Sequence, residues 1–264
     1  LCFELNELTA AEKLDSLRAE GPGFIGLSFP TISAYGANSA MAHYSATPEN
    51  YAVVEKKGFY LVDSGGQYMG ATTDVTRTVV CGPLTEVEKR DFTLVTVANL
   101  NLLNAKFLHG TTGRFLDAYA RAPLWDLGLN FNHGTGHGIG YILNVHEGPQ
   151  NIRYQYGPGM KEAVFEEGMI VSDEPGVYLE GEYGIRIETI LEVVEHNVTP
   201  CGHFLAFSPL TLVPLDRALI DPAYLTPETK ETLNPYHARV YEEIAPLLTH
   251  EEAEWLRAQK MPIE

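Results

Sequence analysis

The sequence is poor in cysteine, in long apolar runs and in basic side chains, and each shortage excludes a class of protein. Its three cysteines are scattered and odd in number, so neither a disulfide framework nor a paired-cysteine metal site is expected. No segment approaches the ~18 uninterrupted apolar residues that a membrane-spanning helix requires. The first residues lack the basic and apolar regions of a signal peptide. We therefore expect a soluble, cytoplasmic protein.

Basic side chains are outnumbered, because 18 Lys and Arg face 35 Asp and Glu and give a formal net charge of -17. Such a charge repels phosphate backbones and anionic membranes, so nucleic acid and lipid are poor candidates as partners. Part of the negative charge is expected to bind cations instead. The chain is long enough, at 264 residues, to bury a large core. It begins at Leu1 rather than at a methionine, and we expect it to be a piece of a longer protein.

Helices are predicted on both sides of a region with strand character. We expect them over 7–20, from about 85 to 107, over 113–127, and after Pro227 in the tail. A Thr followed three residues later by Glu can form a capping box at a helix start. This pattern occurs at Thr9 and Glu12, at Thr85 and Glu88, and at Thr249 and Glu252.

Two segments rich in Val, Ile, Tyr and Thr, with glycines at the turns, predict antiparallel hairpins. In the first, Asp63 follows the run FYLV, and Asp74 lies eleven residues further on. In the second, Glu174 follows MIVSD, and Glu188 lies fourteen residues further on, with Gly181 midway. Each hairpin brings two carboxylates together across a ladder. The chain therefore presents two carboxylate pairs from segments of similar design.

Four ionised carboxylates on buried strand faces require counter-charge. At an effective dielectric near 20, each pair ~4 Å apart costs roughly 4 kcal/mol. Protonation or bound cations must relieve this repulsion. Four carboxylates and one neutral imidazole balance two divalent ions, and the glycine-flanked His137 is the candidate nitrogen ligand. An oxygen-rich set of this kind suits Mn²⁺, with Co²⁺ or Zn²⁺ as alternatives.

A plainer interpretation exists for each residue taken alone. An acidic residue in a glycine-rich hairpin is more often a turn or surface residue, and a single histidine is more often an ordinary packed or exposed side chain. We keep that interpretation for the remaining histidines, His109, His196, His203, His237 and His250. Two matched hairpins with a glycine-flanked histidine between them are harder to explain in this way.

Five motifs extend this pattern: YLVDSGGQYMGATTDVTRT, HGTGHGIG, NVHEGP, DEPGVY and YGIRIE. In order and spacing they resemble the pita-bread metallopeptidases, which include aminopeptidase P, prolidase, methionine aminopeptidase and the metal-free creatinase. The likeness is greatest to the catalytic domain of the cytosolic three-domain aminopeptidase P, whose C-terminal extension resembles SPLTLVPLD and the helical tail.

The resemblance implies an α/β (α+β) pita-bread fold, with pseudo-two-fold halves, curved antiparallel sheets and outer helices. It implies a catalytic domain over 1–214 and a helical extension over 215–264 packed on it, without the N-terminal domains of the family. The implied metal ligands, with the second and the last bridging the two ions, are Asp63, Asp74, His137, Glu174 and Glu188.

The resemblance also implies roles around the ligands. His43, His133 and His146 would line the substrate cleft, and Arg186 would be a charge partner of the ligands. A metal-bridging hydroxide would attack the carbonyl that precedes proline. Glu174 would carry its proton to the departing nitrogen, and His146 would hydrogen-bond the carbonyl oxygen.

The implied activity is removal of the first residue from peptides with proline in second position, by an enzyme that is a homodimer at full length. One alternative is a prolidase-like Xaa-Pro dipeptidase, against which the C-terminal extension argues. A second is a non-catalytic binding protein on the same fold, although all five ligands are present here. A methionine aminopeptidase resembles the chain mainly in GHGIG and in ligand order.

Overall fold

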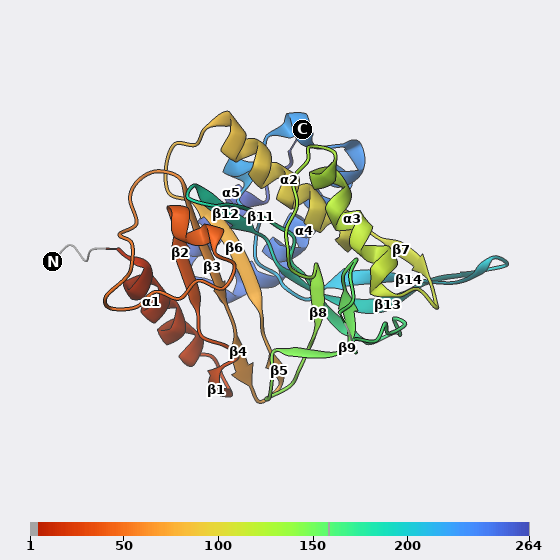
Figure 1. Cartoon of the computed structure of the whole chain (residues 1–264). Coiled ribbons are helices and arrows are strands. Elements are labelled where there is room, and N and C mark those ends of the chain that lie inside the picture. Colours follow the sequence, from red (N-terminus) through yellow and green to blue (C-terminus); the bar gives the residue numbers. More distant parts are fainter. Residues whose placement is uncertain (1–4, 158, 264) are drawn as a thin grey trace.

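Two halves of the molecule repeat one strand arrangement, in which an antiparallel ladder continues into a shorter hairpin (Figure 1). The computed structural model describes residues 5–157 and 159–263. In the first half β3 pairs with β6 and with β2, while β4 pairs with β1 and β5. Its strands are β1 (Phe24–Leu27), β2 (Ile32–Tyr35), β3 (Phe59–Ser64), β4 (Gly66–Tyr68), β5 (Ala71–Thr72) and β6 (Val75–Val80).

The second half has the same plan, with β10 paired to β13 and the hairpin of β11 and β12 between them. Its larger sheet has the order β7-β14-β13-β10-β8-β9. Gly181 turns the β11–β12 hairpin at a φ of 77°, a conformation that favours glycine. The strands are β7 (Lys106–Leu108), β8 (Gly136–Ile139), β9 (His146–Ile152), β10 (Ile170–Asp173), β11 (Gly176–Leu179), β12 (Tyr183–Arg186), β13 (Thr189–Thr199) and β14 (Gly202–Pro209).

Helices cover the outside of these sheets, and α2 and α3 pack against each other there (Figure 1). The buried face of α2 contributes Phe92, Val95 and Leu102 to a core that also contains Val171 and Leu191. None of the described helices is long and apolar enough to cross a membrane. The helices are α1 (Glu7–Ala19), η1 (Gly36–Ala40), α2 (Glu86–Leu103), α3 (Gly113–Trp125), η2 (Arg217–Leu219), η3 (Pro222–Tyr224), α4 (Pro227–Ile244), η4 (Ala245–Leu247) and α5 (His250–Gln259).

The predicted capping box of the first helix and the predicted end of the second helix are wrong. Helix α1 is capped by Asn6 rather than by Thr9, because the Asn6 side chain accepts from the Thr9 amide at 2.9 Å. Helix α2 ends at Leu103, and Phe107 instead lies in β7, opposite Leu205 of β14. The capping boxes predicted at the starts of α2 and α5 are confirmed.

The C-terminal region shares the main core. Leu233, Tyr236 and Val240 of α4 are buried in the same cluster as the residues of α2. Arg77 of β6 joins this region to the sheets, since it donates to the Val213 carbonyl at 2.7 Å and to the Tyr236 hydroxyl at 3.0 Å. Helix α4 therefore packs against α2 and is hydrogen-bonded to β6, and α5 packs against α4.

Candidate metal centre

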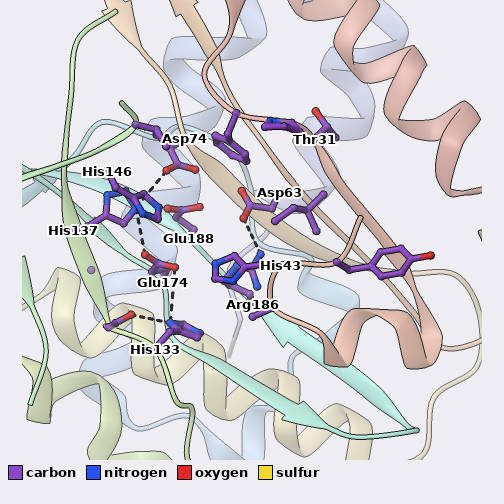
Figure 2. A pocket seen from close by; sticks show the side chains of 18 of the residues that line it. Thr31, His43, Asp63, Asp74, His133, His137, His146, Glu174, Arg186 and Glu188 are labelled. Carbon is purple, nitrogen blue, oxygen red and sulfur yellow. Dashed lines mark hydrogen bonds and ion pairs between the residues drawn. The ribbon is translucent and has the colours of Figure 1, made fainter. Parts of the chain in front are cut away.

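The four acidic residues lie where each ladder meets its hairpin. Asp63 is near the end of β3, and Asp74 immediately precedes β6. Glu174 immediately follows β10, and Glu188 immediately precedes β13. Because both halves place carboxylates at equivalent junctions, and because the halves face each other, all four side chains point into one space (Figure 2).

The side chains are close enough together to share cations. Three groups each offer ligand atoms that lie within 4.8 Å of one another, and every predicted ligand belongs to at least one of them. Asp74 and Glu188, the predicted bridging residues, each belong to two. The groups are Asp74 with His137 and His146, His137 with Glu174 and Glu188, and Asp63 with Asp74 and Glu188.

His137 presents one ring nitrogen to this space. Its Nδ1 donates to the Gly138 carbonyl at 2.9 Å, which leaves Nε2 with a free lone pair. That Nε2 lies 3.5 Å from Asp74 Oδ2 and 3.4 Å from Glu174 Oε1. A Cβ on Gly136 would lie 1.9 Å from the Ser172 carbonyl oxygen, so glycine is required for β8 to approach β10.

Without bound cations, the charged forms of these carboxylates are unfavourable in the protein. Burial raises the pKa of Asp63, of Glu188 and of Glu174, the last to about 7, and neighbouring carboxylates raise each further. Asp63 Oδ1 is buried and has no hydrogen-bond partner among the described residues. A buried carboxylate oxygen without a partner is costly unless a cation contacts it. The donor set therefore fits two divalent ions bound by oxygen and one imidazole.

Arg186 connects the acidic cluster to the wall of the cavity. Its Nη2 contacts Asp63 Oδ2 at 2.7 Å, in line with the predicted role as a charge partner. Its Nη1 donates to the Tyr178 hydroxyl at 2.8 Å, and that hydroxyl contacts His133 Nε2 at 2.8 Å. A continuous chain of polar contacts thus runs from Asp63 to His133.

His133 is held neutral in a single tautomer. Burial, with Arg186 and Arg121 nearby, lowers its pKa to about 4. Its Nδ1 lies 2.8 Å from the Gly134 carbonyl oxygen and must donate to it, so Nε2 accepts from Tyr178. Both ring nitrogens are therefore engaged by the protein, and His133 lines the cavity through the rest of its ring.

A cavity of about 460 Å³ opens beside the acidic cluster. The three predicted cleft histidines all line it. His146 is exposed at the start of β9, with its ring centroid 3.8 Å from that of His137, and burial and the charge of His137 lower its pKa. His43 lies in a turn shortly after η1. Figure 2 shows all three rings around the carboxylates.

Three polar residues of the site were missed from the sequence. Ser172 accepts from the His137 amide and contacts Glu174 Oε1 at 3.2 Å. Thr76 donates to Glu188 Oε2 at 2.9 Å, and Tyr178 joins Arg186 to His133. Tyr178 lies in the motif DEPGVY just after Glu174, and this nearness in sequence was the one signal that could have indicated it.

Comparison with known proteins agrees with this geometry. The profile of metallopeptidase family M24 matches residues 4–195, and that of the C-terminal region of peptidase M24 matches residues 203–263. Aminopeptidase P1 of Arabidopsis thaliana is 44% identical over 264 residues, which is 98% of this chain and 40% of that protein. Xaa-Pro aminopeptidase 2 of Sus scrofa is 43% identical over 98% of this chain and 38% of its own length. The chain thus spans about two fifths of these relatives.

Solved structures share the fold. The X-prolyl aminopeptidase of Caenorhabditis elegans, described as a cytosolic enzyme with a di-nuclear active site, has a TM-score of 0.90 and 40% identity, covering 98% of this chain and 42% of its own. Prolidase of Pyrococcus furiosus has a TM-score of 0.64 and 29% identity over 76% of this chain and 54% of its own. The predicted pita-bread fold is confirmed by these neighbours. The chain belongs to metallopeptidase family M24.

Proposed function

We propose that this chain is the catalytic region of an aminopeptidase that removes the first residue from peptides with proline in second position. The observation that supports this most directly is the convergence of the four carboxylates with His137 beside a cavity. The Sus scrofa relative named Xaa-Pro aminopeptidase 2 and the Caenorhabditis elegans X-prolyl aminopeptidase, which both match nearly the whole chain, support the substrate class.

We propose two divalent ions, which the predicted ligands Asp63, Asp74, His137, Glu174 and Glu188 would hold. Mn²⁺ is the proposed ion, with Co²⁺ or Zn²⁺ as alternatives, because the donors are mostly oxygen. When bound, the ions would supply a water of lowered pKa as the nucleophile and would polarise the scissile carbonyl.

The protein's own side chains then carry the proton. Glu174, whose Oε1 faces Ser172 and His137, accepts the proton of the attacking water and delivers it to the departing nitrogen. Delivery is needed because the nitrogen of a peptide-bonded proline carries no hydrogen. His146 is neutral and exposed in the cavity, so its one ring N–H is free to donate to the scissile carbonyl oxygen. His43 and His133 shape the cavity around the peptide.

The proposal includes the organisation of the protein. We place the catalytic domain at residues 1–214 and its helical extension at 215–264; the separate profile matches over 4–195 and 203–263 support a boundary nearby. A cytosolic location is supported by the description of the Caenorhabditis elegans enzyme. A homodimer is proposed for the full-length protein, and neither nucleic acid nor membrane is proposed as a partner at a net charge of -17.

Substituting Glu174 tests the mechanism. Glu174→Gln removes the proton acceptor, and we expect hydrolysis of an Xaa-Pro tripeptide by the Mn²⁺-loaded protein to fall about 10²- to 10⁴-fold. Glu166→Gln, which changes an exposed residue paired with His109, serves as a matched control with full activity. Turnover by Glu174→Gln equal to that of the control would refute the assigned role, whereas no turnover by the unsubstituted Mn²⁺-loaded protein would favour a binding protein.

The peptide that is cleaved separates the aminopeptidase from a prolidase-like dipeptidase, an alternative that the shared fold of prolidase keeps open. An aminopeptidase hydrolyses Xaa-Pro-Xaa tripeptides, whereas the dipeptidase hydrolyses Xaa-Pro dipeptides. Elemental analysis of protein purified without chelator identifies the bound ions.

A further inference from the structure

Arg153, the residue after β9, lines the same cavity as the candidate metal ligands. Its guanidinium covers Gly134, since a Cβ there would lie 2.9 Å from Nη2. Nη1 makes a weak contact with Met160 Sδ at 3.6 Å, and Nε is buried with no hydrogen-bond partner among the described residues. The arginine is therefore held against the cavity wall with its hydrogen-bonding capacity largely unused.

The charge of Arg153 is also unpaired. Within the described ranges, no carboxylate oxygen lies within 4.0 Å of its nitrogens, whereas the other cavity arginine, Arg186, contacts Asp63 at 2.7 Å. A planar guanidinium with free N–H donors matches a carboxylate in geometry and in charge.

We propose that Arg153 binds the C-terminal carboxylate of short peptides, which makes the cavity selective for substrates that end inside it. The proposal rests on the function given above, because a scissile bond at the acidic cluster directs the rest of the peptide along the cavity. A volume of about 460 Å³ encloses most of a ligand the size of a tripeptide. The C-terminal carboxylate is the one anionic group that every such peptide carries.

The test compares hydrolysis of Ala-Pro-Ala with that of its C-terminal amide by the Mn²⁺-loaded chain. We expect the amide to have a KM about tenfold higher at a similar kcat, since a charge-assisted hydrogen bond is lost. In Arg153→Gln the two substrates should have equal KM values, both near the amide value of the unsubstituted protein. Arg153→Lys should recover part of the preference, because it keeps the charge without the planar fork.

Arg114→Gln is the matched control. Arg114 lies on α3, pairs with the exposed Glu162 and does not line the cavity. Its replacement removes the same charge from the protein and should leave the preference for the free carboxylate intact. A loss of preference in this control as well would attribute the effect to net charge and overturn the proposal.

Two other outcomes would also overturn it: equal KM values for acid and amide in the unsubstituted protein, or an equal rise for both in Arg153→Gln. If no peptide is cleaved, the proposed function fails, and binding of the dipeptide Pro-Ala and its amide, measured by calorimetry, still tests Arg153. An affinity about tenfold higher for the acid, abolished by Arg153→Gln, supports the subsite. Equal affinities for the two ligands refute it.

Discussion

Arg114 and Arg121 lie on the same helix, α3, but differ in burial and in the number of their hydrogen bonds, which decide their effects on stability. Arg121 is fully buried and contacts Asp117 Oδ2 at 2.7 Å, with side-chain exposures of 0% and 1%. It also donates to the carbonyls of Phe131 and His133, and so fixes the loop that carries His133. Arg114 pairs with Glu162 at the surface.

We expect Arg121→Ala to lower the free energy of unfolding by about 3 to 5 kcal/mol, because Asp117 is left charged and buried. Arg114→Ala should change it by less than about 1 kcal/mol, since exposed ion pairs contribute little. Urea denaturation of both variants measures the difference. Similar losses in the two would contradict the assigned burial.

The raised carboxyl pKa values predict how stability changes with pH when metal is removed. In the folded chain Asp63, Glu174 and Glu188 keep protons at a pH where the unfolded chain has lost them, so stability falls as pH rises through this range. His133 and His237, with pKa values lowered to about 4, have the opposite effect, but only below their ordinary pKa of 6.5. The window from pH 6.5 to 8 therefore reports the carboxyl groups together with His137, whose raised pKa acts in the same direction.

Across this window each carboxyl that stays protonated when folded lowers the unfolding free energy by on the order of 2 kcal/mol. We expect the Tm of chelator-treated protein to fall by about 5 °C or more from pH 6.5 to 8. Added Mn²⁺ should remove most of this decrease. Scanning calorimetry at both pH values provides the measurement, and a Tm in chelator that rises with pH would be inconsistent with a buried acidic cluster.

At the scale of residues, the acidic cluster was predictable because each of two glycine-containing hairpins carries a pair of acids, one on either side of its turn. The partners of these residues were not. Ser172 and Tyr178 contribute single hydroxyl groups, and many strand hydroxyls have no such contact. Arg153 belongs to neither the repeated hairpins nor the motifs, so it is recognised as a site residue only because it lines the cavity.

Helix α1 anchors the segment that carries His43 through one buried side chain. Glu7 accepts from the amide of Tyr35 at 2.6 Å, from the amide of Ala52 at 2.7 Å and from the hydroxyl of Tyr44 at 2.9 Å. Burial and Glu7 together raise the pKa of Tyr44 to about 12. The backbone on either side of residues 36–51, which include His43, is thereby tied to the start of one helix.

Glu7→Gln places an amide NH₂ where these donors converge, and we expect a loss of about 2 to 4 kcal/mol in the free energy of unfolding. The loosened segment should also raise KM more than it changes kcat, because His43 shapes the cavity. Glu12→Gln, on the exposed side of α1, is the control and should behave like the unsubstituted protein. Denaturation and limited proteolysis of 36–52 report the effect, and unchanged proteolysis would argue against the anchor.

The hairpins and most helices could be predicted because local patterns specify them. The exceptions show where local patterns compete. Both Asn6 and Thr9 can cap a helix, and the hydrogen bonds of Glu7 to Ala52 and Tyr35 accompany the observed cap at Asn6. Phe107 continues a helical pattern, but pairing with Leu205 draws it into a sheet, and that partner is distant in sequence.

At the scale of the molecule, the C-terminal region and the sheets form one packed body. Leu233, Tyr236 and Val240 are buried in the main core, and Arg77 spans from the Tyr236 hydroxyl to the Glu188 carbonyl. Removal of 215–264 would expose this apolar surface and leave Arg77 with fewer acceptors.

We therefore expect a chain that ends at residue 214 to be aggregated or molten, with retained far-ultraviolet but weakened near-ultraviolet circular dichroism. Gel filtration and circular dichroism of the truncated chain test this. A monodisperse, cooperatively unfolding product would show instead that the extension is an independent addition.

The strand order of the larger sheet could not be predicted from the sequence. Strand β7 pairs with β14, which is distant in sequence, and no local pattern indicates such a pairing. The likeness of the two halves could be predicted because each half carries a pair of acids on either side of a glycine-containing turn.

Each half supplies two of the four carboxylates, and this division has a consequence for biosynthesis. Asp63 and Asp74 leave the ribosome long before Glu174 and Glu188 have been translated. At roughly 5 to 20 residues per second, the first pair waits several seconds for the second. A nascent chain therefore offers only half of the donors, and loading of the ions is expected to follow completion of the second hairpin.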